Sequence, residues 1–374
     1  MISFRPTEEE QAFCEVAKTI ACDELRPLAR ECEQSRSVSA SIARRLHELG
    51  FLALELPEQW GGLELPLISQ AQIWQSLSFG DLGIVQGLPG PGEAAPFMRL
   101  APSHPVWRRY RESGQGRIWP TAVFVDGEET IELRRQGDGY VLNGTSVPIR
   151  LAASAEWVVI AAKESEGEPV IVVLDDQGWE TVEGDFRLGL LAAGLGRLRF
   201  SERFVSNDGV LARGSEAAAL LAHARARQCV LEAAKEVGLM EAALEYAIQY
   251  TAGRKAFGQE IAKFQGVSFT IAEMAFECRG ARNIVWAAAC RVEEQGGEAE
   301  SHAWRALARA HRSVRFVTDQ AVQMLGGHGY VQEYPVEKWM RDAQAQVMLY
   351  ARETDWLIRR GEQLLRERKE RVAR

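Results

Sequence analysis

The stretch of sequence that decides the fold runs from Gln323 to Tyr330 and reads QMLGGHGY, and residues 333–343 follow it with EYPVEKWMRDA. Gly326 and Gly327 have no Cβ, so their backbone amides can approach a phosphate or an adenosine closely. Gln323 precedes them by about one helical turn. A glycine pair alone often only ends a helix. Its combination with the flanking residues is a far more specific signal.

The composition is that of an ordinary globular protein. The chain has 374 residues, of which 46% are hydrophobic and 26% are charged, and this length allows two or three domains around a large core. A formal net charge of -8 argues against broad binding of nucleic acid, which requires excess Lys and Arg. No apolar stretch reaches the roughly 20 residues that span a bilayer. Residues 1–6 lack the apolar core of a signal peptide. We expect a cytoplasmic protein that binds neither nucleic acid nor membranes.

The cysteines indicate neither disulfides nor a metal site. They are widely spaced in helix-like sequence, without a Cys-x-x-Cys pair or a histidine at zinc-ligand spacing. We expect reduced thiols and no bound metal. The six positions are Cys14, Cys22, Cys32, Cys229, Cys278 and Cys290.

Three regions of different character follow one another along the chain. Thr7 to Glu10 has the form of a capping box, and helical apolar spacing continues from there to about Tyr110. From Ile118 to about Leu211, short β-rich runs alternate with Gly, Asp and Asn turns. Beyond Ser215 the sequence is Ala-rich and helical almost to its end.

The predicted fold class is therefore α+β, with three parts in an unusual order. The parts are an N-terminal α-helical domain (1–117), a small central β-domain in the form of a β-barrel (118–211) and a C-terminal four-helix bundle (212–374). The four predicted helices of the bundle span about 215–252, 263–295, 298–325 and 345–368.

Two further segments support a family resemblance. Residues 250–259 read YTAGRKAFGQ, with Phe264 and Gln265 after them, and residues 57–62 read PEQWGG. Together with the 323–330 run, they resemble the acyl-CoA dehydrogenase family over nearly the full length. The resemblance implies the same three-part fold, an oxidoreductase of fatty acid metabolism, FAD as cofactor and an acyl-CoA thioester as substrate.

The resemblance also implies roles in cofactor binding. In the family, an arginine at the position of Arg254 meets the FAD pyrophosphate of a neighbouring subunit, which suits the bidentate geometry of a guanidinium. The chain is then expected to form a homo-oligomer, a dimer or tetramer, or a hetero-oligomer with a second family chain. A lone histidine in this loop, His328, is expected to be structural. The other cofactor-binding candidates are Phe257, Gln265, Gln323, Gly326 and Gly327.

The residue that the family uses as catalytic base is missing from this sequence. Family members remove the substrate α-proton with a glutamate, whose position falls on Tyr350 or, in another alignment, on Ala351. Some branches place it on the first long helix of the bundle, where this chain has Gln228. None of these side chains can act as that base. Two carboxylates remain as candidates, Glu353 first and Glu232 second.

The part of the family pattern that holds the flavin ring is also altered. Where the family has a Thr-Glu-Pro-x-x-Gly-Ser-Asp segment, this chain has the shorter sequence FVDGEE at residues 124–129. In the second flavin-binding strand, Pro148 cannot donate a backbone hydrogen bond, and Arg150 replaces a threonine.

Three functions fit this pattern. The first is an FAD-dependent dehydrogenase that desaturates an acyl-CoA between its α and β carbons, with a relocated base. The alternative is a catalytically impaired subunit that completes the FAD site of a partner subunit in a hetero-oligomer. The second alternative is a flavin oxidase of the same fold.

Overall fold

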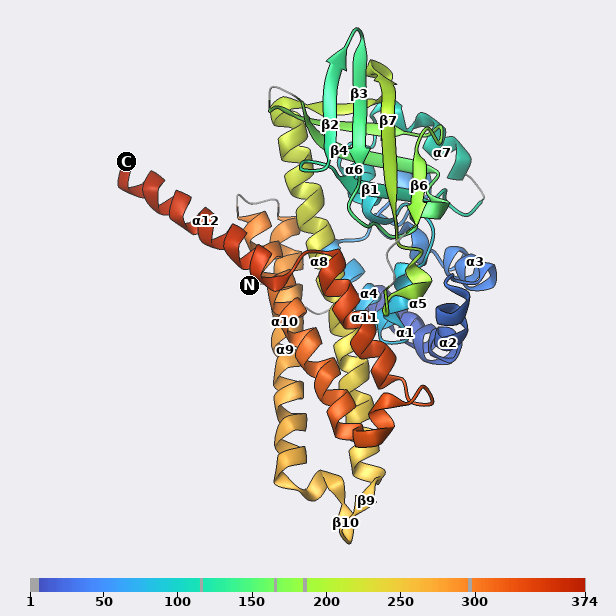
Figure 1. The fold of residues 1–374 in the computed structure, drawn as a ribbon, viewed down its shortest axis with the longest axis vertical. Coiled ribbons are helices and arrows are strands. Elements are labelled where there is room, and N and C mark those ends of the chain that lie inside the picture. Colours follow the sequence, from blue (N-terminus) through green and yellow to red (C-terminus); the bar gives the residue numbers. More distant parts are fainter. Residues whose placement is uncertain (1–6, 115–116, 165–166, 184–186, 295–297, 374) are drawn as a thin grey trace.

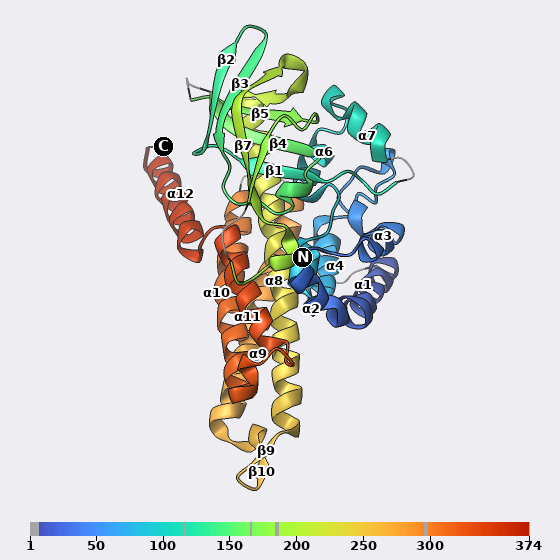
Figure 2. The ribbon, with the colours of Figure 1, turned by 45° about the vertical axis from the view of Figure 1, so that its right-hand side comes forward.

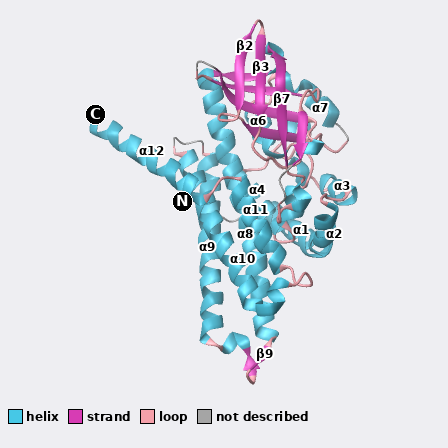
Figure 3. Ribbon diagram, viewed as in Figure 1, coloured by secondary structure: helices cyan, strands magenta, loops and turns pink. Residues whose placement is uncertain are grey.

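The computed structural model describes residues 7–114, 117–164, 167–183, 187–294 and 298–373. The molecule is elongated, with a sheet at one end, long helices running to the other end and shorter helices along one side (Figure 1). Figure 3 shows the strands of the sheet gathered at one end of an otherwise helical molecule. Within the described residues, none of the helices is both long and apolar enough to cross a membrane.

The first part of the chain is helical, as predicted. The capping box is confirmed: the Thr7 hydroxyl accepts a hydrogen bond from the Glu10 amide, and the Glu10 carboxylate accepts one from the Thr7 amide. A π-helical turn (Ala21–Leu25) joins the first two helices. The helices are α1 (Glu8–Ile20), α2 (Arg26–Ser35), α3 (Ala40–Glu48), α4 (Leu67–Ser78), α5 (Leu82–Gln86), α6 (Ala95–Leu100) and α7 (Arg108–Gly114), and the 3-10 turn η4 (Gly92–Ala94) precedes α6.

The second part forms an eight-stranded sheet in the order β6-β7-β3-β2-β4-β5-β8, with β1 paired to β4. Most neighbours are antiparallel, but β1 and β2 each run parallel to β4. No pairing among the described residues joins β6 to β8, so the predicted β-domain is an open sheet rather than a closed barrel. The strands are β1 (Ala122–Asp126), β2 (Ile131–Gln136), β3 (Gly139–Thr145), β4 (Trp157–Glu164), β5 (Pro169–Leu174), β6 (Glu180–Glu183), β7 (Gly196–Ser206) and β8 (Val210–Arg213).

Strand β4 is buried on both faces, which explains its almost continuous apolar sequence. Because successive side chains of a strand point to opposite faces, its residues divide between two hydrophobic cores. Trp157 and Val159 join the core shared with the N-terminal helices and the start of α8. Val158 and Ile160 join the core on the other face of the sheet. The sheet is thereby fixed against the helical parts of the molecule.

The third part consists of long helices that run away from the sheet (Figures 1 and 2). One of the four predicted helices, expected at about 345–368, is in fact two: the chain breaks after Leu349, where Ala351 has φ 68°. The helix after this break projects outward from the bundle. The helices are α8 (Gly214–Gly253), α9 (Gln265–Glu293), α10 (Ala299–Leu325), α11 (Val336–Leu349) and α12 (Glu353–Ala373).

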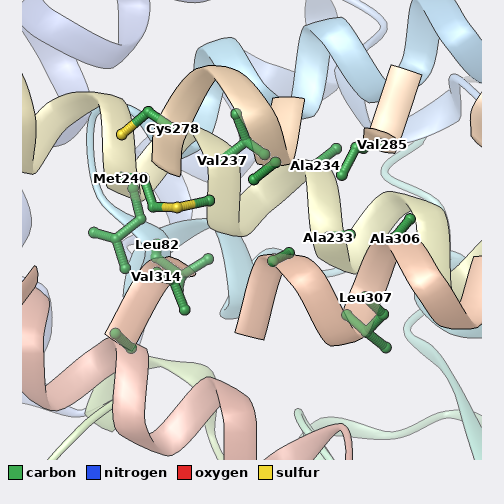
Figure 4. Close-up of a cluster of buried hydrophobic side chains, with 14 of the residues drawn as sticks. Leu82, Ala233, Ala234, Val237, Met240, Cys278, Val285, Ala306, Leu307 and Val314 are labelled. Atoms are coloured by element: carbon green, nitrogen blue, oxygen red, sulfur yellow. The ribbon is translucent and has the colours of Figure 1, made fainter. Parts of the chain in front are cut away.

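Small side chains allow these helices to pack closely. Figure 4 shows Ala233, Ala234 and Val237 of α8 among side chains from α9 and α10. Cys278 of α9 lies in the same core, and burial raises the pKa of its thiol far above the ordinary value. An inert, reduced thiol is expected in such surroundings. The predicted domain boundaries at 117 and 211 stay predictions.

Candidate active site

A cavity of about 220 Å³ lies where the sheet meets the long helices. Its walls come from β1, residues 147–150 after β3, α8, α10 and the junction between α11 and α12. Much of the lining is apolar and includes Phe124, Ile149, Leu307, Leu349 and Trp356. A largely apolar cavity with a few polar groups is typical of a small-molecule site.

The carboxylate of Glu93 is the polar centre of this cavity. It comes from η4 in the N-terminal part of the chain and meets residues from three other regions. Its Oε1 accepts hydrogen bonds from Arg150 Nε at 2.6 Å and from the Tyr350 hydroxyl at 2.7 Å. Its backbone carbonyl accepts a third from Gln228 Nε2 at 2.6 Å. At this point the contacts join the N-terminal part, the β-domain, helix α8 and the end of helix α11.

A glycine allows this close approach. Gly92 has φ +46°, a left-handed conformation that favours glycine, and a Cβ at this position would lie 2.3 Å from Arg150 Nη2. The guanidinium also donates from Nη1 to the carbonyls of Gln86 and Leu88, each at 3.1 Å. Arg150 is therefore a buried cation held by one carboxylate and two backbone carbonyls.

The charges around Glu93 shift the pKa values of the groups in the cavity. Burial alone would raise the pKa of the Glu93 carboxyl, but the positive charges of Arg150 and Lys235 outweigh it and lower this pKa. Burial and the carboxylates of Glu232 and Glu93 raise the pKa of the Tyr350 phenol well above its usual range. At neutral pH Glu93 is therefore ionised and Tyr350 is a neutral hydrogen-bond donor.

The second predicted base, Glu232, also lines the cavity, but both of its oxygens are engaged. Oε1 accepts from Lys235 Nζ at 2.5 Å. Oε2 accepts from Gln86 Nε2 at 2.5 Å and from Gln346 Nε2 at 2.9 Å. This fully satisfied buried cluster is suited to holding α5, α8 and α11 together.

A smaller cavity of about 70 Å³ lies beside the first. Glu93, Arg150, Gln228 and Glu232 line both, so this polar group stands between the two spaces. The smaller cavity is otherwise lined largely by apolar side chains of the N-terminal part, among them Trp74.

Glu353, the first of the two carboxylates that the sequence suggested as the base, does not line the cavity. Glu353 is half-buried at the start of α12, whereas Tyr350, Ala351 and Trp356 on either side of it line the cavity. Sequence reasoning missed Glu93. The available signal was a lone acidic residue directly after a Gly-Pro-Gly turn, in a segment that is otherwise apolar.

The predicted cofactor-binding residues gather at the far end of the long helices. Arg254 follows α8, and Phe257 stands at the tip of the hairpin formed by β9 (Lys255–Ala256) and β10 (Gln259–Glu260), which Figure 1 shows at that end. Gln265 begins α9. All three side chains are exposed. So are Gln323, Gly326 and Gly327 around the end of α10.

This far-end group is well separated from the cavity of the same chain. Gln228, which lines the cavity, and Arg254 are 26 positions apart along α8. At 1.5 Å per residue, the helix places them about 39 Å apart.

His328 has a structural role at the far end. Its Nδ1 lies 2.7 Å from the Tyr250 hydroxyl, and its ring stacks on Tyr334 with centroids 4.8 Å apart. These contacts join the loop after α10 to α8. Among the described residues, no group of His, Cys, Asp and Glu side chains is arranged to hold a metal ion.

Comparisons with known proteins identify the family of this chain. The family described as acyl-CoA dehydrogenase, C-terminal domain, matches residues 215–349, and the acyl-CoA dehydrogenase N-terminal domain matches residues 7–94. Together they cover more than half of the chain. The protein belongs to the acyl-CoA dehydrogenase family, whose members are flavoproteins that act on acyl-CoA thioesters and typically bind FAD.

Individual relatives extend the match to nearly the whole chain. The mitochondrial short-chain specific acyl-CoA dehydrogenase of Bos taurus is 26% identical over 352 residues, which cover 90% of this chain and 85% of the relative. The structure of butyryl-CoA dehydrogenase from Megasphaera elsdenii has a TM-score of 0.82 at 24% identity and covers 97% of this chain and 100% of that one. A glutaryl-CoA dehydrogenase from Mycobacterium smegmatis, solved in complex with FADH2, has a TM-score of 0.82 at 18% identity, with 96% and 95% covered. The two structures demonstrate the fold.

Proposed function

We propose that this chain is an FAD-dependent acyl-CoA dehydrogenase that removes one hydrogen each from the α and β carbons of an acyl-CoA thioester. The observation that carries the proposal is the cavity between β1, residues 147–150 and α8. Gln228 and Tyr350, which the family resemblance aligns with positions of the catalytic base, both line it. The reacting carbons of the substrate would lie in this cavity.

The cavity and the far-end group suit different parts of FAD. The apolar walls around Phe124 and Trp356 suit the flat flavin ring. The Arg254 guanidinium is exposed and forms no ion pair within the described residues, so it is free to bind a pyrophosphate. Bound FAD would supply the acceptor for the β-hydrogen and its electron pair. The separation of about 39 Å along α8 is longer than an extended FAD molecule. Each FAD would then lie in the cavity of one chain and against Arg254 of another.

The surface around the far-end group, here called the far-end surface, has exposed aromatic side chains that suit contact with another chain. Phe257 is 94% exposed and has φ +53°, at the first position of a two-residue hairpin turn that favours Asn, Asp or Gly. A strained, exposed aromatic side chain indicates a binding role. Phe269 and Phe276, seven residues apart on α9, are 62% and 73% exposed. We propose a homo-oligomer in which these side chains become buried.

One observation favours a second candidate function. Neither Tyr350 nor Gln228 carries a carboxylate, so the chain would be inactive in its own cavity if no other residue served as the base. Its far-end residues would still complete the FAD site of an unlike partner. In that case the protein is an impaired subunit of a hetero-oligomer.

A spectrum of the protein expressed alone distinguishes these two functions. We expect a yellow protein. When a short acyl-CoA is added under anaerobic conditions, the visible absorbance of its flavin should bleach. Colourless protein that takes up flavin only with a second family chain would contradict autonomous activity. Bleaching that is followed by rapid consumption of oxygen in air would instead indicate a flavin oxidase.

A further inference from the structure

We propose that Glu93, on η4 of the N-terminal part, is the carboxylate that accepts the substrate α-proton. The inference rests on the proposed function and names its missing base. It moves the base to a segment that belongs neither to the α11–α12 junction nor to α8.

The geometry that points to Glu93 is its contact with Tyr350 and Gln228, the two residues that the resemblance aligns with the family's base. Tyr350 donates to its Oε1 at 2.7 Å, and Gln228 donates to its backbone carbonyl at 2.6 Å. Both of these side chains and Glu93 line the same cavity. The base therefore lies on a third element, where Tyr350 holds its carboxylate and Gln228 holds the backbone of the same residue.

A comparison of the carboxylates that line the cavity singles out Glu93. The two oxygens of Asp126 are engaged by Arg225, and the two oxygens of Glu232 are engaged by Lys235 and two glutamines. Oε1 of Glu93 accepts two hydrogen bonds, but within the described residues no hydrogen bond ends at Oε2. This oxygen is the one left to accept a proton.

The proposed step is a simple proton transfer. The α C–H bond of the thioester breaks, the proton bonds to Glu93 Oε2, and the electron pair stays on the α carbon, delocalised into the thioester carbonyl. Arg150 and Tyr350 are positioning residues, because they fix Oε1 and so orient the carboxylate. A well-placed general base contributes about 10²–10⁴-fold to a rate.

The same contacts make Glu93 a weaker base than an isolated carboxylate. The nearby positive charges lower its pKa, which keeps it ionised at neutral pH but reduces its affinity for a proton. A thioester that fills the cavity would exclude water and strengthen every interaction there.

Exchange of the α-hydrogen tests this assignment without relying on net turnover. Purified flavin-bound protein is incubated with butyryl-CoA in D2O, and deuterium at the α carbon is measured by mass spectrometry. Glu93→Gln should slow the exchange about 10²–10⁴-fold while the bound flavin and the Kd for butyryl-CoA stay close to wild type. The control is Glu132→Gln, an exposed glutamate of β2, which should exchange at the wild-type rate.

Each outcome bears on the assignment. A folded Glu93→Gln protein whose exchange rate is within about twofold of wild type would overturn it. Glu93→Gln alone could fail to fold because it leaves Arg150 unpaired. In that case the exchange rate of the double variant Glu93→Gln, Arg150→Met is compared with that of Arg150→Met. If the double variant exchanges the α-hydrogen at the same rate as Arg150→Met, the role of Glu93 is also overturned. Wild-type protein that neither exchanges nor bleaches would refute the proposed function itself.

Discussion

The Tyr350 hydroxyl donates a hydrogen bond to Glu93 Oε1 at 2.7 Å, across 257 positions of the chain. It joins the end of α11 to η4 and so ties the helical bundle to the N-terminal part at the cavity. Because the acceptor is charged, such a bond is worth about 1.5–3 kcal/mol.

Tyr350→Phe should separate positioning from catalysis. The variant keeps the ring and loses only the hydroxyl, so we expect kcat to fall about tenfold, the equivalent of about 1.4 kcal/mol, with little change in KM. Stopped-flow reduction of the flavin by butyryl-CoA measures this. A large rise in KM with unchanged kcat would mean that Tyr350 binds substrate rather than orienting Glu93.

Glu353→Gln and Glu93→Gln distinguish the two candidate bases. Glu353 does not line the cavity, so its amide variant should reduce the flavin at a rate within about twofold of wild type, whereas Glu93→Gln should lose most of its rate. Anaerobic reduction rates and flavin content of both variants give the answer. The reverse pattern would restore Glu353 as the base and exclude Glu93.

Acid stability should depend on Glu93. The pKa of its carboxyl is lowered in the folded protein from an ordinary value of 4.5, so its stabilising contribution is present above that pH and is lost as the pH falls through the folded pKa. Glu93→Gln cannot titrate and should lose less stability than wild type between neutral pH and pH values below 4.5. Thermal unfolding midpoints across this range measure the difference. Parallel curves would show that Glu93 has the same pKa in both states.

A buried charge cluster should matter strongly for folding. Lys338 Nζ lies 2.6 Å from a carboxylate oxygen of Asp81 and 2.6 Å from one of Asp342, and all three residues are buried. Lys338→Met leaves two uncompensated carboxylates and should lower the free energy of unfolding by about 3–5 kcal/mol. Urea unfolding measures it. Lys263→Met, at an exposed lysine, is the control and should change little. Equal stability of the two variants would contradict a charged cluster.

The far-end surface should control assembly. Phe257→Asp places a charge at the exposed tip of the β9–β10 hairpin and should reduce both the oligomer size and the flavin bound per chain. Light scattering and the ratio of visible to ultraviolet absorbance measure these quantities. Leu188→Asp, at a residue that is 76% exposed elsewhere, is the control. Full assembly and flavin content in Phe257→Asp would exclude the hairpin from the interface.

The sequence predicted the parts of the fold that depend on local patterns. The capping box at Thr7 and the apolar run of β4 carry their signals within a few residues, and both elements form as expected. The break at Ala351 was missed because the residues around it are compatible with a helix, and an alanine gives no local signal for the left-handed conformation found there.

The centre of the cavity could not be read from the sequence in the same way. Arg150, Gln228 and Tyr350 lie 57, 135 and 257 positions from Glu93, and only the folded chain brings them together. A glutamate on a short 3-10 turn carries no periodic signal of its own. Resemblance to a family also directs attention to positions that the family uses, whereas the base proposed here lies on another element.

Complementation between two inactive variants tests the central claim most directly, because the claim is that one site combines the cavity of one chain with the far-end group of another. Glu93→Gln disables the cavity, and Arg254→Ala disables the far-end group. The two chains carry different tags, are co-expressed and are purified through both tags. The mixed oligomers that result contain some sites in which the cavity and the far-end group are both intact. We predict that flavin reduction by butyryl-CoA returns to as much as about half of the wild-type rate per pair of chains, while each variant alone stays inactive. Mixed oligomers as inactive as their parents would contradict the shared site.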